Sequence, residues 1–182
     1  GFTPASIIND APLALPDPSR PNGIWTPSND DGKFAGPMRV REALVQSKNL
    51  VSVRLLDAIG VRYMREYATR FGFSQDAIPA NLSMALGTAS VSPMSMARGY
   101  AAFANGGYRV SPYLVTQVDM NGKEVYLRHV PPPPRVISQD INRDMTAMLY
   151  GVVVSGTGGY ASLHGREAAG KTGTTQDSHD AW

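Results

Sequence analysis

The sequence predicts an α+β fold, and three observations support that prediction. Apolar residues recur at helical spacing in five separate segments of the chain. Two alternating segments flank Asn121-Gly122, which is a signal for a β-hairpin. Small and β-branched residues over Ala168–Thr174 predict a strand. We therefore expect helices packed on a sheet, one strand of which ends at Thr174.

The N-terminal part of the chain is expected to be irregular. Residues 1–36 are rich in Pro, Asn, Asp and Gly, a composition that predicts a run of turns. Trp25 and Phe34 are expected to hold this run against the core. Pro37 then opens a helical pattern that stops near Ser47.

The next segments predict further helices and one hairpin. A second helix is expected over Leu50–Ile59, with Asn49 as its N-cap, so Ser47 and Asn49 fall in a tight link between two helices. The remaining predicted elements are a helix over Val61–Phe71, a helix that starts at Ser92-Pro93 and ends at Asn105, a hairpin of Tyr113–Asp119 with Glu124–Val130, a stiff connector over Pro131–Pro134, and a helix over Ile141–Val154 capped by Ser138.

The composition excludes several classes of function. A chain of 182 residues is one domain or most of one, and its net charge of +2, without basic runs, gives no argument for nucleic acid. It has no cysteine, which excludes thiolate catalysis and cysteine-ligated metals. The three histidines have no metal-ligand spacing, so we expect no metal and no cofactor. No apolar run approaches the ~18 residues of a membrane span, so any membrane anchor is expected outside this sequence.

Two polar motifs carry the functional signal: Ser47-Lys48-Asn49 and the segment Gly170–Thr175. Beside a lysine whose pKa is lowered, Ser47 would relay protons, and Lys171 would supply positive charge. Asn49 is suited to hold an amide because it offers both a donor and an acceptor. The remaining candidates are Thr172 and Thr174, whose hydroxyls would bind a substrate carboxylate, and Gly173, which lets a peptide approach the backbone.

The third part of such a site is absent. A serine acyltransferase of this kind places its nucleophilic serine three residues before a lysine. No serine in these 182 residues has a lysine at that offset. The sequence therefore predicts most of a serine acyl-transfer site without its nucleophile, and the chain by itself is expected to form no acyl-enzyme.

The lysine-containing motif has two other interpretations. Gly165–Thr172 satisfies the phosphate-loop pattern, but neither a preceding buried strand nor a following helix is predicted there. The motif also fits a glycine-rich turn with an exposed Lys171. Taken alone, the motif Ser47-Lys48-Asn49 is weak evidence for a catalytic site, because Asn49 could then have no role other than to cap a helix.

The chain resembles the transpeptidase domain of class A penicillin-binding proteins, the bifunctional enzymes that build bacterial cell walls. The matching segments are Gly36-Pro37, Arg41–Leu44, Ser47–Asn49, Leu86–Thr88, Ala101–Gly107, Arg135–Ser138, Gly156–Gly158, Gly170–Thr175 and Asp180–Trp182. The resemblance implies the penicillin-recognising serine transpeptidase or β-lactamase-like fold, with helices packed on a mainly antiparallel sheet. It also implies crosslinking of D-Ala-D-Ala stem peptides through an acyl-enzyme, inhibition by β-lactams, and a place on the periplasmic face of the bacterial inner membrane.

The resemblance also implies a role for each motif residue. Ser47 matches a proton-relay serine, Asn49 the asparagine that holds the substrate amide, and Lys171 the lysine of the third motif. Thr172 and Thr174 match carboxylate-binding hydroxyls, and the Thr174 N–H matches one oxyanion donor. By this comparison residues 1–182 are a partial transpeptidase domain, with the nucleophile segment before residue 1 and further strands and a helix after residue 182.

Two alternatives on the same fold remain open at this point. One is a noncatalytic domain that binds or scaffolds the cell wall. The other is a hydrolase similar to serine β-lactamases, for which a glutamate that activates water would be needed, and Glu124 and Glu167 lie in unsuitable contexts.

Overall fold

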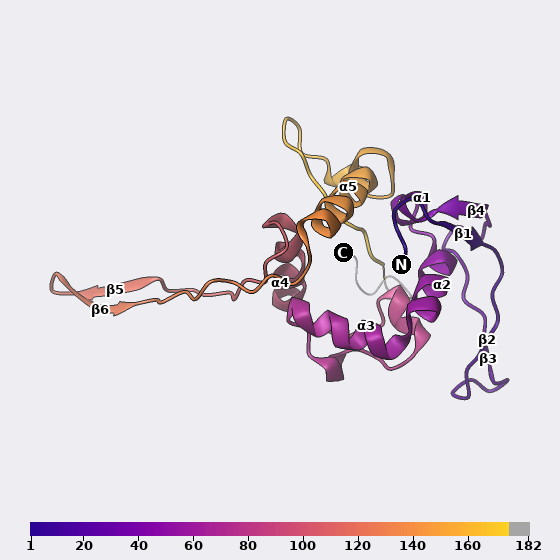
Figure 1. Cartoon of the computed structure of the whole chain (residues 1–182), viewed down its shortest axis with the longest axis horizontal. Helices are drawn as coiled ribbons and strands as arrows, with labels where there is room; N and C mark the ends of the chain where they lie inside the picture. The colour runs from indigo at the N-terminus through magenta and orange to yellow at the C-terminus, as the bar shows by residue number, and fades with distance from the viewer. Residues whose placement is uncertain (175–182) are drawn as a thin grey trace.

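The computed structural model describes residues 1–174, which form helices joined to short two-stranded antiparallel sheets (Figure 1). The strands are β1 (Ile7–Asp10), β2 (Leu15–Pro16), β3 (Ile24–Trp25), β4 (Gly36–Arg39), β5 (Gln117–Met120) and β6 (Lys123–Leu127). The α-helices are α1 (Val40–Val45), α2 (Asn49–Ile59), α3 (Val61–Ala68), α4 (Pro93–Ala104) and α5 (Gln139–Ser155). Short 3-10 helices lie at Thr69–Phe71, Gln75–Ala77, Leu82–Leu86 and Gly159–Ala161.

Strands β1 and β4 pair where the sequence predicts only turns and a helix start. Ile8 lies opposite Met38 in this pair, and both side chains pack with Ala43 of α1 and Val51 of α2. The prediction that Pro37 begins a helix is therefore wrong, because residues 36–39 bury Met38 by pairing with a strand about thirty residues earlier. The first helix begins only at Val40.

Helices α2 and α3 follow the predicted pattern. Helix α2 buries Leu50, Val51, Val53 and Leu56. Gly60, with a φ of 89°, separates it from α3. The predicted third helix continues to Phe71, but its last turn tightens into a 3-10 helix before the left-handed Gly72.

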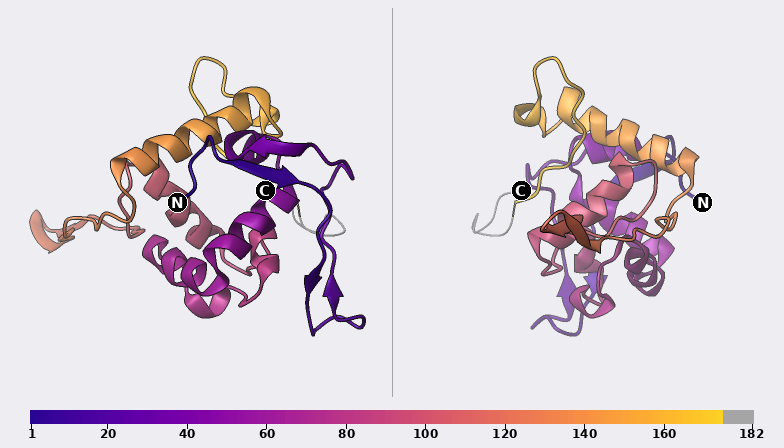
Figure 2. Two further views of the ribbon diagram at one scale, coloured as in Figure 1. Left: turned by 45° about the vertical axis from the view of Figure 1, so that its right-hand side comes forward. Right: turned by 90° about the vertical axis from the view of Figure 1, so that its left-hand side faces the viewer.

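A second core cluster joins α4 to the segment before α5. Ala102 of α4 packs against Val136 and Ile137, with Tyr67, Phe71 and Phe103 around them. The serines predicted as caps for the two helices are confirmed: Ser92 Oγ accepts from the N–H of Ser95 at 3.2 Å, and Ser138 Oγ accepts from the N–H of Ile141 at 3.3 Å. Figure 2 shows α5 lying alongside α1, and these two helices pack together.

The hairpin of β5 and β6 extends away from the helices (Figure 1). Asn121 and Gly122 at its tip have φ angles of 51° and 75°, the left-handed conformations that a tight hairpin turn needs. The predicted hairpin is confirmed, and its strands are shorter than the sequence pattern suggested.

Two further local predictions are wrong. Phe34 is 51% exposed and does not hold the N-terminal loop against the core, whereas Trp25 is half-buried opposite Leu15. The predicted strand over Ala168–Thr174 is not formed: residues 168–173 have no regular secondary structure, and only Thr174 takes part in a β-bridge.

Candidate active site

Ser47 occupies a left-handed turn at the end of α1. The N–H of Ser47 donates to the carbonyl of Leu44 at 3.1 Å, and that of Lys48 donates to the carbonyl of Ala43 at 2.9 Å. This pair of bonds is the Schellman arrangement, whose left-handed position usually holds glycine. Ser47 has a φ of 56°, a conformation that costs a residue with a Cβ about 1–2 kcal/mol. The turn therefore presents a hydroxyl where a glycine would be easier to accommodate.

The ammonium group of Lys171 meets this hydroxyl. Lys171 Nζ donates to Ser47 Oγ at 2.8 Å and to the carbonyl of Thr172 at 2.9 Å. The structure therefore brings together the Ser47 and Lys171 side chains, which the sequence predicted for one site. Burial lowers the pKa of the Lys171 side chain. Within residues 1–174, no carboxylate lies within ion-pair distance of this ammonium.

The end of α5 brings the two motifs together. The N–H of Thr157 donates to the carbonyl of Val45 at 3.3 Å, which ties the loop after α5 to the last residue of α1. Gly156 lies so close to α1 that a Cβ there would be 2.3 Å from the Val45 carbonyl oxygen. On the other side, the hydroxyls of Thr157 and Thr172 are 2.9 Å apart. Thr157 thus bridges the Ser47 turn and the segment that carries Lys171.

Of the other predicted site residues, Thr172 accepts a hydrogen bond from Lys171 through its carbonyl, whereas Asn49, Gly173 and Thr174 lie near the pair in sequence only. The sequence predicted Asn49 as the N-cap of α2, and this prediction is wrong, because Lys48 is at the N-cap position. Asn49 Nδ2 instead donates to the carbonyl of Ser28 at 3.0 Å. Gly173 and Thr174 are exposed. Within the described part of the chain, no hydrogen bond joins Asn49, Gly173 or Thr174 to Ser47 or Lys171.

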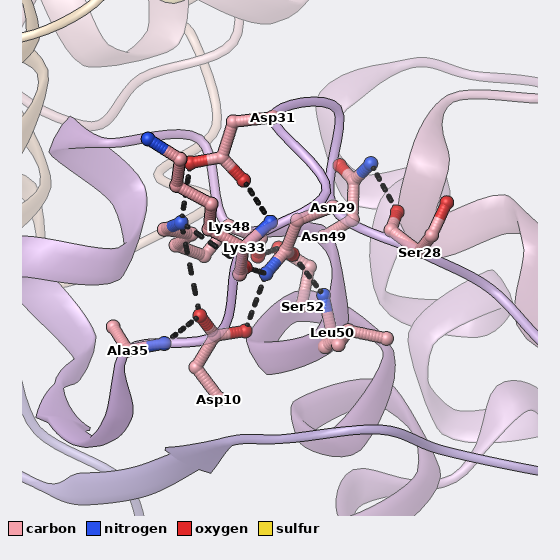
Figure 3. A network of polar contacts seen from close by, with 10 residues as sticks. All are labelled: Asp10, Ser28, Asn29, Asp31, Lys33, Ala35, Lys48, Asn49, Leu50 and Ser52. Atoms are coloured by element: carbon pink, nitrogen blue, oxygen red, sulfur yellow. Dashed lines mark hydrogen bonds and ion pairs between the residues drawn. The ribbon is translucent and has the colours of Figure 1, made fainter.

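Lys48 is a residue whose importance the sequence did not show. Its side chain is only 6% exposed and forms an ion pair of 2.8 Å with Asp31, within a network that also includes Asp10 and Asn29 (Figure 3). These partners lie 17 or more residues earlier in the chain, and a sequence pattern does not reveal such a burial. The one signal in the sequence was that two of only four lysines lie in the two polar motifs.

The structure does not have the surroundings of a phosphate-binding loop. Gly165 lies next to an isolated bridge between Leu163 and Arg166, and residues 168–173 form no strand. Among residues 1–174, no helix follows Lys171 whose N-terminal N–H groups would cradle a phosphate. Over the same residues, no helix is both long and apolar enough to cross a membrane.

A family model described as the penicillin binding protein transpeptidase domain matches residues 2–181. The chain belongs to this family. Both polar motifs lie within the matched region, although residues 175–181 of the match lie outside the part that the structure describes.

Individual relatives agree with this family assignment. The chain is 44% identical over 191 residues to penicillin-binding protein 1A of Neisseria lactamica, covering 100% of this chain and 24% of that protein. It is 35% identical over 233 residues to penicillin-binding protein 1A of Pseudomonas aeruginosa, covering 100% of this chain and 28% of that protein. The chain thus spans about a quarter of the length of these curated relatives.

Solved structures show the same fold. The structure of penicillin-binding protein 1A from Haemophilus influenzae superposes with a TM-score of 0.91 at 30% identity, covering 100% of this chain and 33% of that one. The penicillin-binding protein PonA1 from Mycobacterium tuberculosis has a TM-score of 0.81 at 23% identity, over 99% of this chain and 50% of that one, and supports the fold alone. The α+β, penicillin-recognising fold expected from the sequence is confirmed.

Proposed function

We propose that this domain belongs to a peptidoglycan D,D-transpeptidase, which crosslinks stem peptides ending in D-Ala-D-Ala through a serine acyl-enzyme and is acylated by β-lactams. The observation that carries the proposal is the 2.8 Å hydrogen bond from Lys171 Nζ to Ser47 Oγ. It joins the two polar motifs that the sequence predicted to act together. Membership of the transpeptidase family supports the same function.

In this proposal the nucleophilic serine and its lysine come from residues outside positions 1–182. The serine Oγ attacks the carbonyl carbon of the penultimate D-Ala, and the terminal D-Ala leaves with a proton on its nitrogen. Ser47, which accepts a hydrogen bond from Lys171, relays that proton. In the second step an amino group of another stem peptide attacks the acyl-enzyme, and the serine regains its proton.

Lys171 contributes charge to this reaction. Its ammonium is half-buried and has no carboxylate partner among the described residues, so its field is not cancelled by a neighbour. A cation in such a place stabilises negative charge that develops on a substrate, and it also polarises the Ser47 hydroxyl. We assign carboxylate binding to Thr172 and Thr174, approach of the substrate backbone to Gly173, and the substrate amide to Asn49.

Two observations favour this function over a noncatalytic wall-binding or scaffold domain. A scaffold needs neither a desolvated ammonium nor a serine held at a φ of 56°, and both features are unfavourable for folding. Such unfavourable features persist at sites where function requires them. We place the domain on the periplasmic face of the bacterial inner membrane, with the membrane anchor outside these residues.

The test is labelling of the full-length protein with a fluorescent penicillin. We expect one covalent label per chain, and slow loss of that label, in the wild-type protein. Lys171→Ala should slow the labelling by about 10²–10³-fold, whereas Lys123→Ala, which removes an exposed lysine on the hairpin, should leave it unchanged. An unlabelled wild-type protein would refute the proposal. Rapid release of the label would indicate the hydrolase alternative instead.

A further inference from the structure

Lys48 stands between Ser47 and Asn49 in the sequence, but its side chain points into the protein (Figure 3). Its Nζ lies 2.8 Å from Asp31 Oδ2 and 3.8 Å from Asp10 Oδ2, and the side chain is 6% exposed. A buried ammonium group is tolerated only when it is paired. The hydrogen bond from Lys48 lowers the pKa of Asp31, which agrees with a direct ion pair.

Asp10 ties this ion pair to the rest of the N-terminal segment. Its side chain is fully buried at the end of β1. One carboxylate oxygen accepts from Asn29 Nδ2 at 2.7 Å, and the other accepts from the N–H of Ala35 at 2.9 Å. Through these two hydrogen bonds and its ion pair with Lys48, Asp10 holds the loop of residues 29–35 next to Lys48.

Asn29 connects the same loop to the start of α2. Its Oδ1 accepts from the N–H of Leu50 at 3.2 Å, while its Nδ2 also donates to the carbonyl of Lys33 at 2.7 Å. A lysine at the N-cap has no acceptor to offer the first N–H groups of the helix. Asn29 supplies that acceptor from a distant loop, and Asn49 adds a second link by donating to the carbonyl of Ser28.

We propose that Lys48 is a positioning residue, which fixes the left-handed turn so that Ser47 Oγ faces Lys171 and Asn49 keeps its place at the start of α2. The proposal rests on the function proposed above, because it assigns Lys48 to the same reaction. The backbone N–H of Lys48 closes the turn through Ala43, and its side chain anchors that turn to Asp31 and Asp10. Lys48 therefore acts through Ser47 and not on the substrate.

The first experiment measures the turn itself by hydrogen exchange in the full-length protein. Lys48→Met removes the charge and keeps most of the side-chain volume. We expect faster exchange of the Lys48 and Leu50 amides, which donate to Ala43 and to Asn29, and unchanged exchange in α5. Lys123→Met makes the same chemical change at an exposed hairpin position and should alter neither region. Unchanged exchange at residues 47–50 in Lys48→Met would overturn the proposal.

The second experiment is a double-mutant cycle on the rate constant of acylation by a fluorescent penicillin at saturating concentration. Lys48→Met should lower this rate constant by on the order of 10- to 100-fold, the usual effect of misplacing a catalytic group by about 1 Å. In a Ser47→Ala background the same change should have an effect of less than about 3-fold, because the group that it positions is already gone. An equal effect in both backgrounds would show that Lys48 does not act through Ser47.

A milder variant covers the case in which Lys48→Met fails to fold. Asp31→Asn weakens the ion pair at a carboxylate that is half exposed, and it should produce smaller changes in the same direction in both measurements. If the wild-type protein is not acylated at all, the proposed function fails, while the exchange measurement still decides whether Lys48 holds the turn. Acylation that is normal in variants with faster exchange at residues 47–50 would overturn the positioning role.

Discussion

Lys171 Nζ lies 2.8 Å from Ser47 Oγ, although 124 residues separate the two in the sequence. The contact depends on the packing of α5 against α1, since the loop after α5 is tied to Val45 and to Thr172. The pair is therefore a product of tertiary structure and not of either motif alone. Changes at either partner, or in the packing that joins them, should have distinguishable effects.

Lys171→Ala in the full-length protein should reduce penicillin acylation by about 10²–10³-fold, the usual effect of removing one charged donor from a transition state. Folding should be preserved, because the ammonium has no carboxylate partner among the described residues and is partly desolvated. Acylation kinetics and thermal unfolding measure the two effects. Loss of ATP binding with normal acylation would instead favour the phosphate-loop interpretation.

Ser47→Gly and Ser47→Ala should separate the hydroxyl from the backbone conformation. Both remove the hydroxyl and should slow acylation equally. The backbone φ of 56° is strained for alanine and not for glycine, so Ser47→Gly should be more stable than Ser47→Ala by about 1 kcal/mol. Free energies of unfolding measure the difference. An alanine variant that is the more stable of the two would contradict the left-handed turn.

The rate of acylation should fall as the pH rises and Lys171 loses its proton. Because burial lowers the pKa of Lys171, this fall should occur below pH 10.5, the ordinary pKa of lysine. The same shift affects stability. Between the folded-state pKa and 10.5 the unfolded chain binds more protons, so the free energy of unfolding should rise with pH in that window. Below the folded-state pKa the penalty for burying the charge is fully present.

The pH prediction is tested by comparing the wild-type protein with Lys171→Met. The methionine variant should lack the rise in stability that the wild type shows as the pH approaches 10.5. A wild-type rate that stays constant through that pH would mean that the charge of Lys171 is not needed.

Gly156→Ala should destabilise the protein by about 1–3 kcal/mol or more, as overpacking does. A Cβ at this position would lie 2.3 Å from the Val45 carbonyl oxygen and 2.8 Å from Val45 Cγ1. The φ of −120° is ordinary for alanine, so the effect would be steric. Gly159→Ala, whose nearest contact is 4.0 Å away, is the matched control. Thermal unfolding distinguishes the two variants, and equal stability would contradict the close packing of α5 and α1.

The helices that the sequence predicted well are those with local signals at their ends. Ser92 and Ser138 cap α4 and α5 as expected, and Gly60 ends α2. Caps and apolar spacing are contained within a few residues of sequence, so a sequence pattern is sufficient to place them.

The missed features depend on distant partners. The sequence predicts a helix start where strand β4 lies, because the partner strand β1 is far earlier in the chain and a local pattern does not show the pairing. Residues 168–173 have the composition of a strand, but strand pairing requires a neighbour that composition does not reveal. The site shows the same division: Ser47 and Lys171 were predicted from their motifs, whereas the role of Lys48 depends on Asp10 and Asp31.

The hairpin of β5 and β6 offers a place to attach a reporter. Its residues are exposed, and it extends away from the helices that carry Ser47 (Figure 1). Because these 182 residues contain no cysteine, Glu124→Cys would create a single thiol within them. A fluorophore attached there would report on tumbling, complex formation or proximity to a labelled substrate, while the surroundings of the candidate active site keep their native side chains.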